Sequence, residues 1–276
     1  MNDSGMKITE RGDDFPARAI ILSAGQGRRL LPLTENTPKC LLPVAGKPVI
    51  AWQIDALLAN GIEEIVIVAG FQIGKVEALI AERYHDRSNI RVLFNPFYEV
   101  ADNLASCWIA RNEMHTGFLL LNGDTLLGDD LLPGLLHTQT APINLCIDFK
   151  AEFDDDDMKV QLGPQNQVRQ VSKKLSAGEM DAESIGLIRF SKEGARLFRE
   201  AVEQALREPE KLGSWYLAII SALARQGVVN GYSVAGSRWC EIDFIQDLQK
   251  AEKYFACKET DAADQPRSDQ LLRVPG

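Results

Sequence analysis

The sequence lacks long apolar runs, closely spaced metal-binding thiols or imidazoles, and an excess of positive charge. No hydrophobic stretch reaches the ~18 to 20 residues that a membrane-spanning helix needs. The five cysteines and three histidines are scattered, so we expect reduced, mostly buried thiols in a cytoplasmic protein and no zinc site. The formal net charge of -9 argues against nucleic acid or an anionic membrane as a partner.

The composition that remains is that of a globular α/β protein. The chain has 276 residues, of which 45% are hydrophobic and 25% charged, which is enough for a sizeable buried core. Residues 1–16 are polar, lack the apolar stretch of a signal peptide and are predicted to be a disordered leader. Residues 257–276 are predicted to be a flexible tail. A single domain is therefore expected over residues 17–256.

Short apolar runs alternate with helical patterns in the first half of this domain. This alternation predicts right-handed βαβ units and a doubly wound, mostly parallel, Rossmann-like sheet. The expected strands are 18–23, 65–69, 90–94 and 118–122, and the expected helices are 47–60, 73–84 and 104–111, the last capped by Asp102 or Asn103.

The pattern changes after residue 140. Strands follow one another with little helix between them, which predicts a mixed or antiparallel section that covers one mouth of the sheet. These strands are expected at 143–149, 158–162, 168–171 and 184–190. Helices are expected to return at about 192–207, 214–226 and 244–256.

The most specific local signal is a Gly-rich turn after the first expected strand. In Ala24-Gly25-Gln26-Gly27, the missing side chains let backbone N–H groups approach a phosphate or a base. Arg28 or Arg29 offers a charged fork for phosphate oxygens, and Lys39 adds a further cation. Taken alone, the turn is equally consistent with a tight strand-to-helix connection. It lacks the Gly-Lys-Ser/Thr ending of a Walker loop and the third glycine of a dinucleotide fingerprint.

Two aspartates are candidates for a metal site. Asp124 follows the expected strand 118–122, and the carboxyl end of a parallel strand faces the crevice where ligands bind. Asp243 ends a short expected strand that begins at Trp239. Two aspartates that meet at one phosphate cluster can hold Mg²⁺, a hard cation. From the residues alone, Asp124 as a turn residue and Asp243 as a helix N-cap remain alternatives.

Together these motifs resemble the signature of the sugar-phosphate nucleotidyltransferase superfamily. The pattern Leu-x-Ala-Gly-x-Gly-x-Arg-x-x-Pro-x-Thr is met by residues 22–34, and Pro-Lys-x-Leu-x-Pro-Val-x-Gly-x-Pro is met by residues 38–48. The resemblance implies a nucleotide half at about 17–140 and an acceptor half at 141–256. It also implies roles for residues already singled out: nucleotide binding by Ala24, Gly25, Gln26 and Gly27, catalysis by Arg29 and Lys39, and Mg²⁺ ligation by Asp124 and Asp243.

The segment around residue 103 resembles one branch of this superfamily. Many sugar-nucleotide pyrophosphorylases carry Gly-Thr-Ala there, whereas residues 102–110 resemble the Asn-Asn-x-x-Ser-x-x-x-Ala segment of bacterial CTP:phosphocholine cytidylyltransferases. The resemblance implies that Asn103 and Ser106 lie near the pyrimidine or ribose, although Asp102 stands where that branch has Asn. Lys159 is implied to meet the acceptor phosphate and so to be catalytic, with Lys173 as a second candidate. A solvated surface charge is the alternative for both lysines.

The remaining candidates concern the acceptor. A quaternary ammonium binds aromatic walls and nearby carboxylates, which Trp215, Tyr216, Trp239 and Glu241 offer. Ordinary core and rim positions are the alternative for these aromatics. The acidic run 154–157 is typical of a solvated loop. The alternative is that this run lies above a cationic acceptor. Phosphocholine, an aminoalkyl phosphonate and an inositol or sugar phosphate all stay open as acceptors.

These features predict a Mg²⁺-dependent nucleotidyltransferase that moves a nucleoside monophosphate, CMP from CTP, to a small phosphorylated acceptor and releases pyrophosphate. The second ionisation of a phosphate monoester lies at about pH 6, so the acceptor needs no general base. A sugar-1-phosphate enzyme that uses UTP or another nucleotide and a non-catalytic nucleotide-sensing module are the alternatives. The prediction requires Asp124 and Asp243 to converge beside the Gly25–Gly27 turn.

Overall fold

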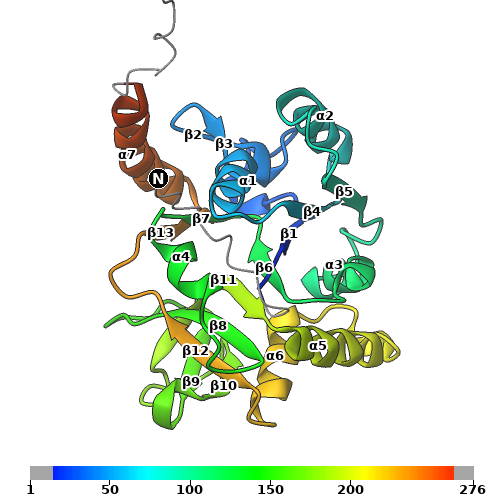
Figure 1. Cartoon of the computed structure of the whole chain (residues 1–276), viewed down its shortest axis with the longest axis vertical. Helices are drawn as coiled ribbons and strands as arrows, with labels where there is room; N and C mark the ends of the chain where they lie inside the picture. The colour runs from blue at the N-terminus through cyan, green and yellow to red at the C-terminus, as the bar shows by residue number, and fades with distance from the viewer. Residues whose placement is uncertain (1–14, 264–276) are drawn as a thin grey trace, which may run out of the picture.

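The computed structural model describes residues 15–263, with side chains described as far as residue 256. Most of the predicted leader and residues 264–276 of the predicted tail lie outside the described residues. Within the described part, the centre of the molecule is a nine-stranded mixed sheet (Figure 1). No helix in this part is both long and apolar enough to cross a membrane.

The first half of the chain forms the parallel side of this sheet. Its strands stand in the order β6-β1-β4-β5, and each neighbouring pair is parallel. They are nearly continuous apolar runs because helices cover both faces, as is usual for parallel sheets. The bounds are β1 Arg18–Ser23, β4 Glu64–Ala69, β5 Ile90–Phe94 and β6 Phe118–Asn122.

Strand β11 (Ala182–Phe190) joins this parallel side to the second half of the chain. It is antiparallel to β6, β8 and β9, and its register with β8 shifts between Ser184 and Ile188. Gly186 lies inside this irregularity with φ +75°, and a Cβ there would lie 2.5 Å from Asn122 Nδ2. The other strands are β8 Ile143–Asp148, β9 Lys159–Leu162, β10 Val168–Ser172 and β12 Val229–Ser233.

Two hydrophobic clusters lie on opposite faces of the sheet. Successive side chains of a strand point to opposite faces, so Ile20 joins one cluster and Ile21 the other. Helices α3 (Asn103–Ile109), α5 (Lys192–Ala205) and α6 (Tyr216–Ala224) pack on the Ile20 face. Helices α1 (Val49–Ala59), α2 (Ile73–Arg83) and α4 (Leu131–Leu136) pack on the Ile21 face.

A third, smaller cluster anchors the segments that carry the site. It holds Leu30, Val44, Leu126, Ile242 and Phe255 together. Four of these residues come from 3₁₀ turn η1 (Arg28–Leu30), the hairpin of β2 (Pro43–Val44) with β3 (Lys47–Pro48), strand β7 (Thr125–Leu127) and α7 (Ile245–Ala263), and Ile242 directly follows β13 (Trp239–Glu241), the strand that pairs with β7. The remaining 3₁₀ turns are η2 Lys39–Leu41, η3 Arg111–Glu113, η4 Pro164–Asn166 and η5 Pro209–Lys211.

The predicted fold class is confirmed, with differences in detail. The strands and helices expected from the sequence are present within a few residues of their expected ends. Four features were not expected: helix α4, strand β12, the β2–β3 hairpin and the pairing of β7 with β13. The last helix, expected at 244–256, continues as far as Ala263.

Candidate active site

A cavity of about 370 Å³ lies at the carboxyl ends of β1 and β6. Gly25 and Gly27 form part of its wall, and Lys39, Asp124 and Asp243 also line it. The Gly-rich turn keeps its shape because the hydroxyl of buried Thr34 donates to the Gly27 carbonyl over 2.8 Å. The side chain of Gln26 donates back to the Thr34 carbonyl over 3.2 Å. Thr34, the last residue of the first motif, therefore holds the turn in shape through these two hydrogen bonds.

Gly27 packs directly against Lys39. Its φ of +77° lies in the left-handed region, and a Cβ there would lie 2.9 Å from Lys39 Cβ and 3.0 Å from Lys39 Cδ. Only glycine meets both requirements without strain. The alkyl stem of Lys39 thus passes over the turn and carries its ammonium group toward the acidic side of the cavity.

The ammonium of Lys39 joins the two predicted metal ligands. Its Nζ lies 2.8 Å from Asp124 Oδ2 and 2.6 Å from Asp243 Oδ1. Arg29 Nη1 lies 3.1 Å from the other oxygen of Asp243. Arg29, Lys39, Asp124 and Asp243 are thus brought together from three distant parts of the sequence beside the Gly25–Gly27 turn, as the sequence-based interpretation requires.

The β7–β13 ribbon explains how Asp243 reaches Asp124. Glu241 pairs with Thr125, and the Ile242 amide donates to the Asp124 carbonyl over 3.0 Å. The buried side chain of Gln53 holds the same corner, because its Nε2 donates to the carbonyls of Asn122 and Thr125, each over 2.7 Å. The ribbon therefore places the carboxylates at positions 241 and 243 next to the end of β6.

Glu241 is a third member of the carboxylate cluster. From the sequence, this residue was instead assigned to the acceptor. One carboxylate oxygen from each of Asp124, Glu241 and Asp243 lies within 4.8 Å of the others. Asp124 Oδ1 is buried and has no hydrogen-bond partner among the described residues. Three convergent carboxylates with an unsatisfied oxygen fit a hard cation such as Mg²⁺. An acidic residue two positions before Asp243 was the available signal, because alternation within a strand brings such side chains to one face.

The crowded charges perturb the titration of this cluster. Burial, reinforced by the charges of Asp124 and Asp243, raises the pKa of Glu241 to about 8. Burial also opposes ionisation of Asp243, but Lys39 and Arg29 outweigh it and hold that pKa below its usual range. Burial would lower the pKa of Lys39, and the two aspartates instead raise it above its usual value. A cation at the cluster would favour the ionised form of Glu241.

Asp243 is not the N-cap of α7. Asp247 lies in the first turn of α7, and its Oδ2 accepts from the amides that precede the helix, those of Asp243 over 3.2 Å and Phe244 over 2.8 Å. The Asp243 side chain is left to face Lys39 and Arg29. This geometry favours the metal interpretation of Asp243 over the capping alternative.

A second cavity of about 260 Å³ continues from the Gly-rich turn toward α3. Ala24, Gly25, Asn103 and Ser106 line it, so four predicted nucleotide-binding residues share one surface. Asp102 is the cap of α3, since its Oδ1 accepts from the Asn103 amide over 2.7 Å. Asn103 Oδ1 accepts from the Tyr216 amide, and buried Ser106 Oγ accepts from Asn95 Nδ2. These contacts fix both polar side chains at the cavity wall.

The predicted acceptor residues divide between two cavities. Lys173, Trp215, Tyr216 and Glu241 line one of about 170 Å³, where Lys173 Nζ lies 4.6 Å from the Trp215 ring centroid. Tyr216 itself is fully buried, and its hydroxyl donates to Asn122 Oδ1. Trp239 lines a separate cavity of about 530 Å³. Glu241 alone among the predicted acceptor residues lines both cavities, and Trp215 and Trp239 line different ones.

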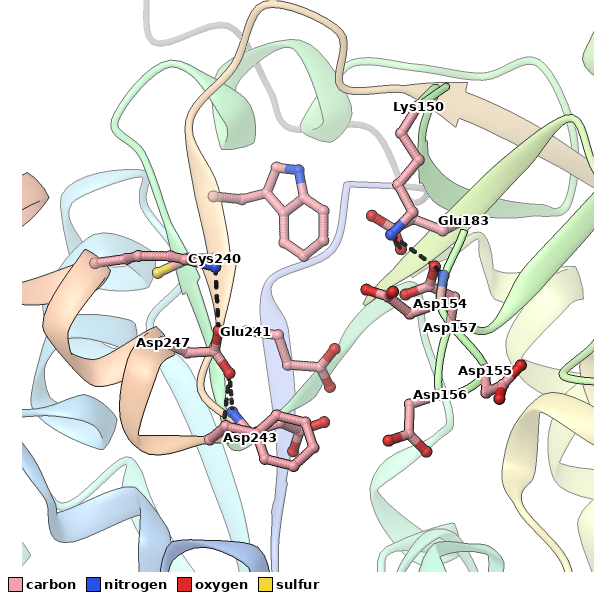
Figure 2. A pocket seen from close by; sticks show the side chains of 13 residues that line it. Lys150, Asp154, Asp155, Asp156, Asp157, Glu183, Cys240, Glu241, Asp243 and Asp247 are labelled. Carbon is pink, nitrogen blue, oxygen red and sulfur yellow. Dashed lines mark hydrogen bonds and ion pairs between the residues drawn. The ribbon is translucent and has the colours of Figure 1, made fainter. Parts of the chain in front are cut away.

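Figure 2 shows the larger cavity, where carboxylates approach one another from two sides. Eight acidic residues and two lysines line it. Asp154 to Asp157 come from the loop before β9, and Glu241 and Asp243 come from the end of β13. The sequence named Asp156 only as part of the acidic run 154–157. It did not anticipate that Asp156 links Arg29 to Lys173 at 3.2 and 3.4 Å, or that Lys150 pairs with Glu183 at 2.7 Å.

Lys159 does not reach the cavities that hold the other predicted site residues. The side chain is buried, and its Nζ donates to the carbonyls of Asp154 over 2.6 Å and Lys173 over 3.2 Å. A buried ammonium must be paired, and here backbone oxygens are its partners. The expectation that Lys159 meets the acceptor phosphate is therefore corrected: Lys159 holds the acidic loop and Lys173 in position.

The pKa of Glu183 leads to a testable prediction about how the stability of the protein depends on pH. Burial raises its pKa to about 7, from an ordinary value of 4.5, despite the ion pair with Lys150. Between these two values the folded protein retains a proton that the unfolded chain has released, so stability falls as pH rises through this window. We expect the Glu183→Gln variant to lack this fall in stability. Its free energy of unfolding, measured by urea denaturation at pH 5, 6, 7 and 8, should therefore increase relative to that of the native chain as the pH rises. Parallel pH profiles for the two proteins would contradict this.

The fold is one that nucleotidyltransferases of known structure share. The structure resembles the CTP:phosphocholine cytidylyltransferase from Streptococcus pneumoniae with a TM-score of 0.69 and 24% identity, covering 86% of this chain and 98% of that one. This likeness shows the fold. Residues 18–147 match the model of the family described as Nucleotidyl transferase. This match, over slightly less than half of the chain, agrees with the resemblance carried by its signature motifs.

Two curated relatives are cytidylyltransferases. The choline-phosphate cytidylyltransferase of Streptococcus pneumoniae is 38% identical over 103 residues, which are 37% of this chain and 43% of that protein. The CTP:phosphoglutamine cytidylyltransferase of Campylobacter jejuni is 25% identical over 256 residues, 84% of this chain and 97% of that protein. The match thus spans less than half the length of the first relative and nearly all of the second.

Proposed function

We propose that this protein transfers CMP from CTP to a small phosphorylated acceptor that carries a cationic group, and releases pyrophosphate. The observation that carries the proposal is the convergence of Lys39, Asp124 and Asp243 beside the Gly25–Gly27 turn. Choline-phosphate and phosphoglutamine enzymes among the relatives support CTP as the nucleotide. We propose the cytoplasm as the location, because the cysteines Cys40, Cys107, Cys146 and Cys240 are free thiols.

In the proposed reaction the protein positions and neutralises phosphate groups. The glycine amides cradle the triphosphate, and Lys39 and Arg29 balance its charge. The acceptor phosphate, already ionised near neutral pH, attacks the α-phosphorus in line as pyrophosphate leaves. Mg²⁺ held by Asp124, Asp243 and Glu241 would supply further neutralisation of phosphate oxygens. Asn103 and Ser106 line the cavity proposed for the base and ribose.

The charge of the larger cavity supports a cationic acceptor. Its eight acidic residues exceed its two lysines, and Trp239 and Phe244 add aromatic surface. Phe244 is 43% exposed. A quaternary or primary ammonium is attracted by both kinds of group. An uncharged sugar would gain little from the surplus of carboxylates.

The test uses the full chain with Mg²⁺ and each of CTP, UTP, GTP, ATP and dTTP. Each nucleotide is combined with phosphocholine, 2-aminoethylphosphonate, inositol 1-phosphate or glucose 1-phosphate, and both pyrophosphate release and product mass are recorded. We expect turnover with CTP and an amine-bearing acceptor. Turnover with UTP and glucose 1-phosphate would instead establish the sugar-phosphate alternative. Thermal stabilisation by a nucleotide without pyrophosphate release in any combination would indicate a sensing module.

A further inference from the structure

Lys39 occupies the position between carboxylates that a divalent cation would take. Its ammonium is within 2.8 Å of Asp124 and 2.6 Å of Asp243, which are two of the three members of the carboxylate cluster. Magnesium binds carboxylate oxygens at about 2.0–2.1 Å. An ammonium and a divalent cation sharing these two oxygens would repel each other at short range. One of them must therefore leave when the other binds.

We propose that Lys39 is an internal counter-ion that keeps the carboxylate cluster closed to divalent cations until a nucleoside triphosphate draws its ammonium away, an inference that rests on the proposed function. Nucleotide and metal then bind with positive coupling, and each raises the affinity of the protein for the other by the same factor. The metal alone binds weakly, because it must first break the lysine's ion pairs.

The occupied oxygens explain the weak binding expected of the metal alone. Asp124 Oδ2 and Asp243 Oδ1 accept from Lys39, and Asp243 Oδ2 accepts from Arg29. Asp124 Oδ1 is the buried oxygen of this pair that has no partner among the described residues. The Lys39 side chain is 14% exposed, so water screens its ion pairs poorly. A cation from solution meets a cluster whose charge is already balanced.

The Gly-rich turn provides the alternative position for the ammonium. The stem of Lys39 runs along Gly27, and both residues line the same cavity of about 370 Å³. A Cβ at Gly25 would meet nothing within 4 Å, so this side of the cavity is open. A triphosphate lying there offers the ammonium several anionic oxygens within reach of a side-chain rotation. Its arrival therefore releases Asp124 and Asp243 together.

A purely structural ion pair would behave differently. If Lys39 served only to hold the two aspartates in place, its removal would let them separate and would weaken metal binding. If Lys39 competes with the metal, its removal strengthens metal binding in the absence of nucleotide. The two roles therefore predict opposite signs for one measurement that requires no turnover.

The test measures Mn²⁺ binding to the nucleotide-free full chain by titration with electron paramagnetic resonance detection of free Mn²⁺. We expect Lys39→Met and Lys39→Gln to bind Mn²⁺ at least about tenfold more tightly than the native chain, within the ~5- to 150-fold range usual for coupled sites. The Lys39→Arg variant keeps the positive charge and should bind Mn²⁺ as weakly as the native chain. Two uncharged variants are used so that poor folding of one does not remove the test.

Lys47→Met is the matched control. Lys47 is 15% exposed and pairs with Asp55 over 2.6 Å, away from the cluster, so its loss should leave Mn²⁺ affinity unchanged. Equal or weaker Mn²⁺ binding by the folded Lys39→Met and Lys39→Gln variants would overturn the inference, as would equal tightening by Lys39→Arg. Turnover of the native chain is assayed separately, so loss of the proposed function and loss of this inference give different results.

Discussion

Replacing Asp243 with asparagine is expected to lower pyrophosphate release from CTP and acceptor by about 10²- to 10³-fold, the loss seen when one preorganised electrostatic group is removed. The amide has nearly the same shape as the carboxylate, so the fold should be retained. The substitution removes the negative charge that lies 2.6 Å from Lys39 and 3.1 Å from Arg29. Asp124 and Glu241 then remain as the carboxylates of the cluster. Steady-state kinetics and circular dichroism on the same preparation test both statements.

Asp247→Ala separates this effect from damage to α7. Asp247 lies in the first turn of α7 and accepts from the amides of Asp243 and Phe244, so the loss of its side chain should cost about 1 kcal/mol of stability. Most of the turnover should remain, because the carboxylate cluster is unchanged. Near-native turnover of Asp243→Asn would remove Asp243 from the chemistry, and a loss of turnover in Asp247→Ala as large as that of Asp243→Asn would assign both effects to the helix end.

The parallel half of the fold and the centre of the site follow from local patterns. Buried strands read as continuous apolar runs, and the helices between them show their own periodicity. Because β1 and β6 are adjacent and parallel, their carboxyl ends place the Gly-rich turn and Asp124 at one edge of the sheet. The pairing of Lys39 with Asp124 is thus a consequence of strand order, and strand order is constrained by the right-handed connections of βαβ units.

Features that depend on pairings between distant segments were not predictable. The β7–β13 ribbon joins residues more than a hundred positions apart, and neither three-residue strand carries a pattern that specifies its partner. Glu241 was therefore assigned to the acceptor, and only its position two residues before Asp243 pointed to the carboxylate cluster. Lys159 shows the same limit, because a lysine on a short strand is usually exposed, and only the fold shows that backbone carbonyls surround its ammonium. The separation of Trp215 from Trp239 is likewise a property of the tertiary structure.

Replacing Gly27 with alanine is expected to lower kcat/KM for the nucleotide by about 10²-fold, the cost of misplacing a positioned group by about 1 Å. The new Cβ would lie 2.9 Å from Lys39 Cβ and 3.0 Å from Lys39 Cδ, so the lysine stem must shift. That stem leads to the ammonium that meets Asp124 and Asp243, and the shift therefore moves the cation away from both carboxylates. A backbone φ of +77° adds about 1–2 kcal/mol of strain for a residue with a side chain.

Gly46→Ala distinguishes the contact with Lys39 from the backbone strain. Gly46 has nearly the same φ, +74°, in the turn between β2 and β3, but a Cβ there would meet nothing within 4 Å. Both variants should therefore lose similar stability in urea denaturation, whereas only Gly27→Ala should lose kcat/KM. Equal kinetic losses in the two variants would show that strain in the turns, and not the position of Lys39, controls activity. Native kinetics in Gly27→Ala would mean that the Lys39 ammonium reaches its partners by another path, and that the close packing of this glycine on the lysine has no catalytic role.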